Sequence, residues 1–375
     1  QEQVVEAQRH ILGMEHPTTL ISLSNLALTL GMQGAYADAQ LLQERVVEAE
    51  RRILGAEHPG TLSSMNDLAT TLRAQGDYTS ARALLEQVLE ARRRVLGAEH
   101  PGTLSSMNNL ALTLGAQGDQ VGARLLLEQV VEAERRLLGA EHPGTLSSMN
   151  SLAFTLGAQG DHVGARALQE QVVEVRRRIL GAEHPDTLTS LNNLAQTFLA
   201  QGEHARAQAL QEQVVEARRR ILGAEHPDTL TSLNNLAGTF WEQGECASAR
   251  ALLELVLEAR HRVLGVEHPD TLCVMRNLGF CLLQFERARG LSLLHAVLEV
   301  FRRVKPANAD TKTLETLLAR LDMDASSEPI GSLGVLRWPT PRRLSRPRSD
   351  AVATWGWGVA DQGAWSAWAQ GRYIL

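Results

Sequence analysis

The chain has 375 residues, of which 44% are hydrophobic, 21% charged and 4% aromatic, and its formal net charge is -6. This composition allows a buried core built from Ala, Leu and Val, and the acidic balance excludes a general nucleic-acid binder. No apolar run approaches the roughly 18 residues of a membrane span. The three cysteines (Cys246, Cys273 and Cys281) are too few for a disulfide framework, and no signal-peptide pattern opens the chain, so we expect a cytoplasmic protein.

A repeat of constant length organises most of the chain. The dipeptide His-Pro recurs every 42 residues, each time inside a segment close to LGAEHPxTL, at 16–17, 58–59, 100–101, 142–143, 184–185, 226–227 and 268–269. A fixed period between about 20 and 50 residues is typical of stacked supersecondary units rather than separate domains. The sequence therefore predicts a solenoid.

The chain opens in the middle of such a repeat. Residues 1–12, QEQVVEAQRHIL, reproduce 211–222 almost unchanged. We expect them to form the second helix of a truncated repeat, and an exposed single helix is a poor end for a solenoid. This favours further sequence upstream.

Each repeat is predicted to be a helical hairpin. In residues 181–222, Pro185 and Asp186 suit the start of a first helix, helix A, and Gly202 suits its end. The second helix, helix B, begins near Glu203 and ends in Arg218, Arg219 and Arg220, cations that suit the negative end of a helix. Such a hairpin cannot cover its apolar faces alone, so neighbouring hairpins must stack on it.

The remaining repeats follow the same plan up to residue 303. Helix A is expected near 17–33, 59–75, 101–117, 143–159, 185–201 and 227–243, and the seventh hairpin, 269–303, is degenerate because its turn at 284–287 lacks the glycine. Residues 304–322 are expected to form a capping helix. The segment 323–375, rich in Trp, Pro and Arg, is expected to be a largely disordered tail. Its arginines around Ser345 fit either a phosphorylation or docking motif or, as we favour, a solvated tail.

The order Leu191, Leu194, Ala195, Phe198, Gly202 and Ala207 resembles the tetratricopeptide repeat (TPR). The eight additional residues, together with the NNLA motif at 192–195, resemble the 42-residue repeats of kinesin light chains, which are also similar to arrays that follow the nucleotide-binding module of NB-ARC-type signalling proteins. The resemblance covers roughly residues 1–303. It implies an all-α solenoid of antiparallel hairpins wound as a right-handed superhelix, in which helix A lines a concave groove.

No residue pattern in the chain indicates catalysis or cofactor binding. The motifs GxxxxGK[ST], GxGxxG, GxSxG, HExxH and CxxC are absent, so we expect a protein that is not an enzyme and needs no cofactor. The seven repeated histidines lie too far apart for one metal ion, because stacked helices are about 8–10 Å apart, and we interpret them as ends of helices. Glu-Arg pairs of helix B, such as Glu216 with Arg220, are interpreted as a solvated face.

The exposed arc of helix A is the candidate binding surface. One row of it, which we expect to hold the main chain of a peptide because an amide both donates and accepts hydrogen bonds, contains Asn66, Asn108, Asn150, Asn192, Asn234 and Arg276. The row of Thr189 lies beside it. More variable positions, expected to read the side chains of the peptide, include Arg73, Phe154, Gln196 and Trp241. The alternative is that the asparagines satisfy polar groups between repeats, and this structural role is the one that we favour for the row of Asn193.

These observations favour a non-catalytic scaffold that binds extended peptide segments of a partner protein and neither nucleic acid nor membrane. The groove lacks the repeated Lys and Arg of tetratricopeptide carboxylate clamps, which argues against binding of chaperone C-termini. The alternative hypothesis is that the array is the sensor or regulatory part of a larger NB-ARC-type ATPase, whose catalytic module would lie upstream.

Overall fold

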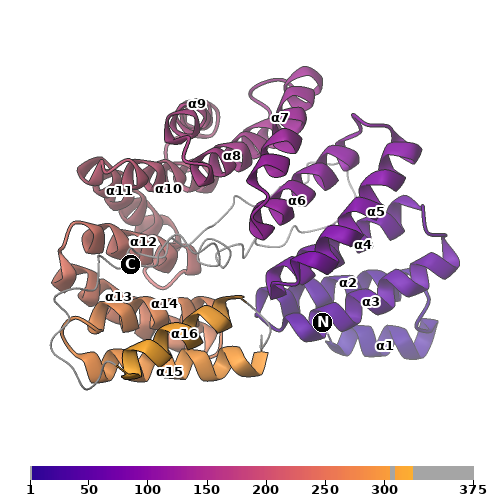
Figure 1. Ribbon diagram of the computed structural model, residues 1–375. Helices are drawn as coiled ribbons and strands as arrows, with labels where there is room; N and C mark the ends of the chain where they lie inside the picture. The colour runs from indigo at the N-terminus through magenta and orange to yellow at the C-terminus, as the bar shows by residue number, and fades with distance from the viewer. Residues whose placement is uncertain (1, 305–308, 324–375) are drawn as a thin grey trace. The chain divides into compact units, whose positions relative to one another are not determined.

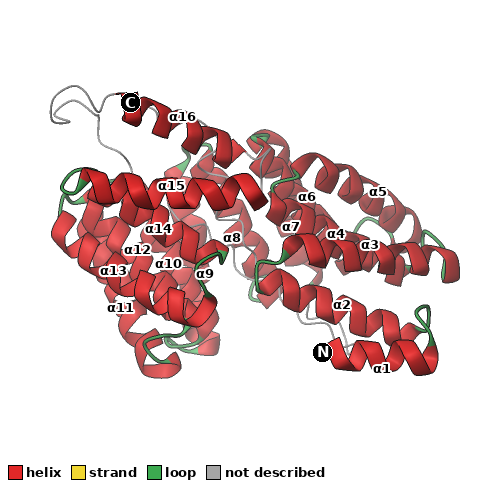
Figure 2. Ribbon diagram, turned by 90° about the horizontal axis from the view of Figure 1, so that it is seen from below, coloured by secondary structure: helices red, strands yellow, loops and turns green. Residues whose placement is uncertain are grey.

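The computed structural model describes residues 2–304 and 309–323, and every regular element in these residues is an α-helix (Figures 1 and 2). The helices fall into two compact units that are divided between Gly160 and Asp161, within the fourth of the seven expected hairpins. The expected tail lies outside the described residues from 324 onward. The all-α prediction is confirmed, with sixteen helices in the described residues.

The first unit contains a single B helix followed by three complete hairpins and the A helix of a fourth. Each helix packs against the next one along the chain, and α4 and α6 each also approach the following A helix. The helices are α1 (Glu2–Leu12), α2 (Pro17–Met32), α3 (Tyr36–Ile53), α4 (Pro59–Gln75), α5 (Tyr78–Leu96), α6 (Pro101–Gln117), α7 (Gln120–Leu137) and α8 (Pro143–Ala158).

The second unit starts with a B helix, continues with three hairpins and ends with one further helix. Here too, each helix packs against its successor. The helices are α9 (His162–Leu180), α10 (Pro185–Ala200), α11 (His204–Leu222), α12 (Pro227–Glu242), α13 (Cys246–Leu264), α14 (Pro269–Leu282), α15 (Arg287–Val304) and α16 (Ala309–Met323). Below, A helices are α2, α4, α6, α8, α10, α12 and α14, and B helices are α1, α3, α5, α7, α9, α11, α13 and α15.

The repeated segment LGAEHPxTL contains the start of each A helix. The Nδ1 atom of the repeated histidine accepts a hydrogen bond from the backbone N–H two residues later, for example from Asp186 to His184 at 3.2 Å. The same bond occurs in all seven His-Pro loops, so each histidine is an N-cap. The following proline occupies the first helical turn, where its missing N–H is not needed. The structural interpretation of the histidines is thereby confirmed.

Glycines end the helices where the chain must turn back. Gly223, after α11, has φ of +92°, and Gly202, after α10, has φ of +78°. Both values lie in the left-handed region that favours glycine, although there is open space around each position. In the seventh hairpin, which lacks the turn glycine, the chain turns instead through a hydrogen bond from the N–H of Glu286 to the carbonyl of Leu282 at 2.7 Å.

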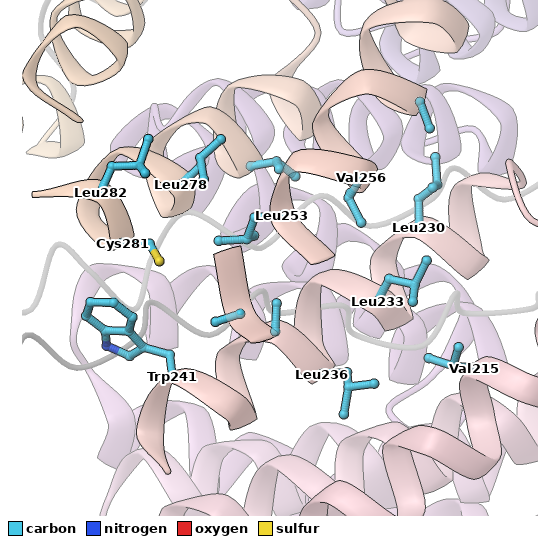
Figure 3. Close-up of a cluster of buried hydrophobic side chains, with 14 residues drawn as sticks. Val215, Leu230, Leu233, Leu236, Trp241, Leu253, Val256, Leu278, Cys281 and Leu282 are labelled. Carbon is cyan, nitrogen blue, oxygen red and sulfur yellow. The ribbon is translucent and has the colours of Figure 1, made fainter. Parts of the chain in front are cut away.

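The core of each unit is a continuous set of clusters between A and B helices. In the first unit, Val46 and Ala49 of α3 belong to one buried cluster with Leu20 and Leu23 of α2 and Val5 of α1. In the second unit, a larger cluster joins α12, α13 and α14 through leucines and valines (Figure 3). Within each unit, a complete hairpin thus buries one side against itself and the other against the next helix pair or helix of the unit, as a solenoid requires.

Candidate functional site

The predicted peptide-binding residues lie on the A helices, and we call these residues the A-helix surface. In the first unit they are Asn66 and Arg73 on α4, Asn108 on α6, and Asn150 and Phe154 on α8. In the second unit they are Asn192 and Gln196 on α10, Asn234 and Trp241 on α12, and Arg276 on α14.

Three asparagines of this surface, Asn66, Asn192 and Asn234, are joined to the next A helix by side-chain hydrogen bonds. The Nδ2 group of Asn235 donates to Oδ1 of Asn192 at 3.1 Å. The Nδ2 group of Asn277 donates to Oδ1 of Asn234 at the same distance. In the first unit, Asn109 donates to Asn66 at 3.0 Å. Asn109, Asn235 and Asn277, three members of the row of Asn193, therefore have the structural role expected for that row, and they also hold the neighbouring row.

The ladder of amides is interrupted at Asn108, where the sequence departs from the pattern, and again at Asn150, where it does not. Ser151 occupies the position of the donating asparagine in α8, and its hydroxyl donates to the carbonyl of Ser147 at 3.4 Å. The Oδ1 atom of Asn108, which would accept from this position, is buried without a hydrogen-bond partner. Both polar atoms of Asn150 are buried without a partner as well. The A-helix surface thus contains unsatisfied amide groups in consecutive repeats.

The bonded asparagines keep one donor that the ladder does not use. Once Oδ1 of Asn192 accepts from Asn235, the orientation of its carboxamide is fixed, and its Nδ2 group has no acceptor among the described residues. The same holds for Asn234 and, in the first unit, for Asn66. Asn192 and Asn234 are buried and Asn66 is half-buried, but none of the three Nδ2 groups is among the buried side-chain atoms that lack a partner, so each keeps access to solvent or to a ligand that offers an acceptor.

The variable positions of the surface differ in their surroundings. Phe154 and Gln196 are half-buried, and Oε1 of Gln196 has no partner. Arg73 is buried at the end of α4, and Arg276 is buried with Nη2 at 3.9 Å from Sγ of Cys273. Trp241 is only 6% exposed and belongs to the buried cluster of α12, α13 and α14, with its ring beside Cys281 in Figure 3. The tryptophan therefore also serves as a core residue.

The buried arginines of the B helices form a second row of polar contacts, which the sequence pattern did not predict. Arg218 was expected only as a cation at the negative end of its helix. Arg218 of α11 is buried. Its Nη1 donates to the carbonyl of Asp228 at 3.0 Å and to the hydroxyl of Ser232 at 2.7 Å, and its Nη2 donates to the hydroxyl of Thr189 at 3.1 Å. The guanidinium joins helix A of its own hairpin to helix A of the next one. Its position four residues after the buried Val214 was the signal that could have revealed this.

The same arrangement occurs in other repeats and engages the row of Thr189. Arg92 donates to Ser63, and Arg260 donates to Thr231. The hydroxyls of Ser63, Thr189 and Thr231 are therefore used inside the solenoid and carry no part of the binding hypothesis below. The outermost arginines form ion pairs within their own repeat. Arg220, near the end of α11, pairs with Glu183 in the loop before α10, a contact that the sequence pattern had not indicated.

Two B helices carry an acid where α5, α9, α11 and α13 carry the buried arginine: Glu50 in α3 and Glu134 in α7. Glu134 of α7 is half-buried, and its Oε2 atom has no hydrogen-bond partner. Burial raises the pKa of this carboxyl above its ordinary value, and a hydrogen bond with Ser148 opposes the shift only in part. Glu134 is therefore expected to lower the stability of the first unit.

The described residues show no candidate metal site, disulfide or membrane-spanning helix. No group of three or more His, Cys, Asp or Glu side chains in the described residues is placed to hold a metal ion. The three thiols are unpaired, and burial raises the pKa of Cys281 to about 12. Among the described helices, none has both the length and the apolar character needed to cross a membrane.

Comparison with protein families identifies the repeats. A family model described as Tetratricopeptide repeat matches residues 42–94, 68–136, 144–220, 199–261 and 228–290, and a second model of the same description matches 19–60. Only such repeats are matched. No curated protein matches the chain.

Solved structures with similar folds are also known. A protein of Podospora anserina, whose nearly identical TPR-like repeats are ascribed to a kinesin light chain, has 37% sequence identity and a TM-score of 0.47, over 55% of this chain and 98% of that one. BtubC (BKLC) of P. vanneervenii has 18% identity and a TM-score of 0.50, over 62% and 93%. A tetratricopeptide repeat protein of Parabacteroides merdae has 14% identity and a TM-score of 0.52, over 81% and 98%. The last two likenesses concern the fold alone.

Proposed function

The chain belongs to the tetratricopeptide repeat family, and from this premise we propose that it is a non-catalytic scaffold that binds extended peptide segments of a partner protein along the A-helix surface. The observation that supports this proposal is the set of amide donors without acceptors on Asn66, Asn192 and Asn234. An extended peptide offers the complementary group, a backbone carbonyl, at regular intervals.

The dimensions of a solenoid suit such a ligand. Packed helices are about 8–10 Å apart, and an extended chain advances about 3.3 Å per residue. Amides on consecutive A helices can therefore meet carbonyls about three residues apart. Because the ladder already fixes each carboxamide, little side-chain entropy is lost when a carbonyl binds, which raises affinity. The neighbouring variable residues Gln196 and Phe154 would then select among peptide side chains.

The proposal is tested by removing the donor while the ladder is kept. Peptides are first selected from a random displayed library, and their affinities are measured by calorimetry. Asn192→Asp keeps an oxygen that accepts from Asn235 but replaces the donating Nδ2 by a carboxylate oxygen, which repels a carbonyl. Loss of one hydrogen bond costs about 0.5–1.5 kcal/mol, and the repulsion adds to it, so we expect affinity to fall about tenfold or more for every selected peptide.

The matched control makes the same chemical change on a B helix. Gln213 is exposed on α11, and Gln213→Glu should leave affinity unchanged. Asn66→Asp makes the corresponding change in the first unit and shows which unit a given peptide occupies. If both Asn→Asp variants bind every selected peptide as the wild type does, while their thermal midpoints fall, the asparagines are structural only and the proposal fails.

We further propose a cytoplasmic location, which the unpaired thiols of Cys246, Cys273 and Cys281 support.

We also propose that residues 13–303 are the functional array and that α16 covers its end. In support, Leu314, Leu318 and Leu321 of α16 are buried in one cluster with Leu294 and Val297 of α15.

A further inference from the structure

Two of the three cysteines lie on helices of the second unit that pack against each other. Cys246 is the first residue of α13, and Cys281 lies near the end of α14. The Sγ atom of Cys281 is 3.8 Å from the carbonyl oxygen of Cys246. The Sγ atom of Cys246 is in turn 3.8 Å from Oε1 of Gln284, in the turn that follows α14. Both contacts place the start of α13 against the end of α14.

The start of a B helix meets the end of the next A helix in an earlier repeat as well. The residue equivalent to Cys246 is His162 of α9, and its carbonyl accepts a hydrogen bond from Gln201, just after α10, at 3.1 Å. In the last hairpin, Phe285 replaces this glutamine and is 60% exposed. The thiol of Cys281 contacts the carbonyl instead, so the departure from the repeat brings the two cysteines together.

Both cysteines are departures from the repeat. The position of Cys281 is a threonine in the six preceding A helices, and the position of Cys246 is Tyr, Gln or His in the preceding complete hairpins. A disulfide joins Cα atoms about 4.4–6.8 Å apart, so it needs cysteines on directly adjacent backbone segments. The contact of Cys281 with the main chain of Cys246 provides this adjacency. Helix ends fray, so Cys246 can make the small adjustment that a bridge requires.

The surroundings give the two thiols different properties. Cys281 is 0% exposed and belongs to the buried cluster of α12, α13 and α14, beside Trp241 in Figure 3. Burial raises the pKa of Cys281 to about 12, and the nearby Cys246 contributes to the same shift. Cys246 packs against the same cluster but is only partly buried, so solvent reaches it. An oxidant in solution therefore meets Cys246 first, while Cys281 stays a protonated thiol.

We propose that Cys246 and Cys281 form a redox-modification site, at which a peroxide produces an intramolecular disulfide that crosslinks the sixth hairpin to the seventh. Hydrogen peroxide first oxidises Cys246 to a sulfenic acid: an S–O bond forms, the O–O bond breaks, and hydroxide leaves with the thiol proton as water. Cys281 then resolves this acid: an S–S bond forms, the S–O bond breaks, and the hydroxyl leaves with the proton of Cys281 as a second water. The peroxide gains the two electrons that the two thiols lose.

The bond would close a loop of 35 residues. Such a crosslink stabilises mainly because it constrains the unfolded chain. In a reducing compartment it would be transient, as redox-sensing disulfides are, so the proposal agrees with a cytoplasmic location. Its test does not depend on peptide binding.

The first experiment identifies the bond. The reduced full chain is treated with hydrogen peroxide, the remaining thiols are blocked, and the protein is digested with trypsin without reduction. Trypsin places the three cysteines in separate peptides, which are 221–250, 263–276 and 277–287. We expect mass spectrometry to find 221–250 linked to 277–287 as the main oxidation product, and dithiothreitol to release both peptides.

Matched variants separate the crosslink from other effects of oxidation. Cys281→Thr restores the residue of the other A helices, and Cys246→His restores the residue of His204, so both should keep the helical content seen by circular dichroism. Oxidation should raise the thermal midpoint of the wild type by about 4 °C or more and leave both variants unchanged. The control Cys273→Ser should form the linked peptide and show the same rise as the wild type.

Four results would overturn the proposal. Peroxide could convert Cys246 to a sulfinic acid, or join two chains through it, while Cys281 stays free. The main linked peptide could instead contain Cys273. The link between Cys246 and Cys281 could form as readily in the urea-unfolded chain as in the folded one, which would show that the fold does not select the pair. The linked wild type could also melt at the same temperature as the oxidised Cys281→Thr variant.

Discussion

The replacement Glu134→Arg should stabilise the first unit, because it installs the buried arginine that other hairpins use. The acceptors are already present in the sequence. Arg92, its counterpart in α5, donates to the carbonyl of Gly102 at 2.7 Å, to Ser106 at 2.8 Å and to Ser63 at 3.0 Å. The equivalent groups around residue 134 are the carbonyl of Gly144 and the hydroxyls of Ser148 and Ser105.

The magnitude follows from the bonds gained and the group removed. Three hydrogen bonds at about 0.5–1.5 kcal/mol each are opposed by desolvation of the guanidinium, and the unpartnered Oε2 of Glu134, which costs about 1–3 kcal/mol, disappears. We expect a net gain of about 1–3 kcal/mol in the free energy of unfolding at neutral pH. Glu134→Gln, which removes only the charge, should give about 1 kcal/mol.

The pH dependence supplies an independent check. Because burial raises the pKa of Glu134, the folded wild type holds this proton more tightly than the unfolded chain, and its stability falls as pH rises from the ordinary carboxyl range through the raised pKa. The advantage of Glu134→Gln over the wild type should therefore be greatest at neutral pH and vanish in acid. Urea denaturation followed by circular dichroism measures both. A wild type more stable than Glu134→Arg at neutral pH would refute the reasoning.

Three further predictions concern the solenoid itself. His184→Ala should lower the stability of the second unit by about 1 kcal/mol in thermal denaturation through loss of the N-cap, while His184→Asn, which keeps an acceptor, should not. Gly290→Ala should destabilise α15, because its Cβ would lie 2.7 Å from the carbonyl oxygen of Gly279, whereas Gly31→Ala, in open space within a helix, should be neutral or stabilising in the same assay. Deletion of one repeat, 185–226, should leave a helical protein with a modestly shifted denaturation midpoint, and complete loss of the helical signal would indicate a single global core instead.

The sequence was sufficient for the fold because each repeat marks its own boundaries. His184 and Pro185 indicate the start of a helix, and Gly202 and Gly223 indicate helix ends. The 42-residue period indicates that the hairpins stack. Helix A, expected at 185–201, ends at Ala200. Near-identical repeats give the same local signal seven times, which is why the helix boundaries agree so closely.

The side-chain contacts between repeats could not be predicted from periodicity alone. A helical wheel places Asn192 on an exposed arc, but whether its oxygen meets Asn235 depends on the offset between neighbouring hairpins. Trp241 lies on the same arc and is nevertheless buried in the cluster of α12, α13 and α14, because α14 closes over it. These contacts depend on the packing angle between hairpins, which the spacing of residues within one repeat does not encode.

The most direct test of the central claim is a crystal structure of the chain with one selected peptide. The account predicts an extended peptide on the A helices, with backbone carbonyl oxygens about 3 Å from Nδ2 of Asn192 and Asn234, or of Asn66 in the first unit, while the bonds from Asn235 and Asn277 remain. A peptide bound to the B helices, or one on the A helices without a contact to these amides, would contradict it.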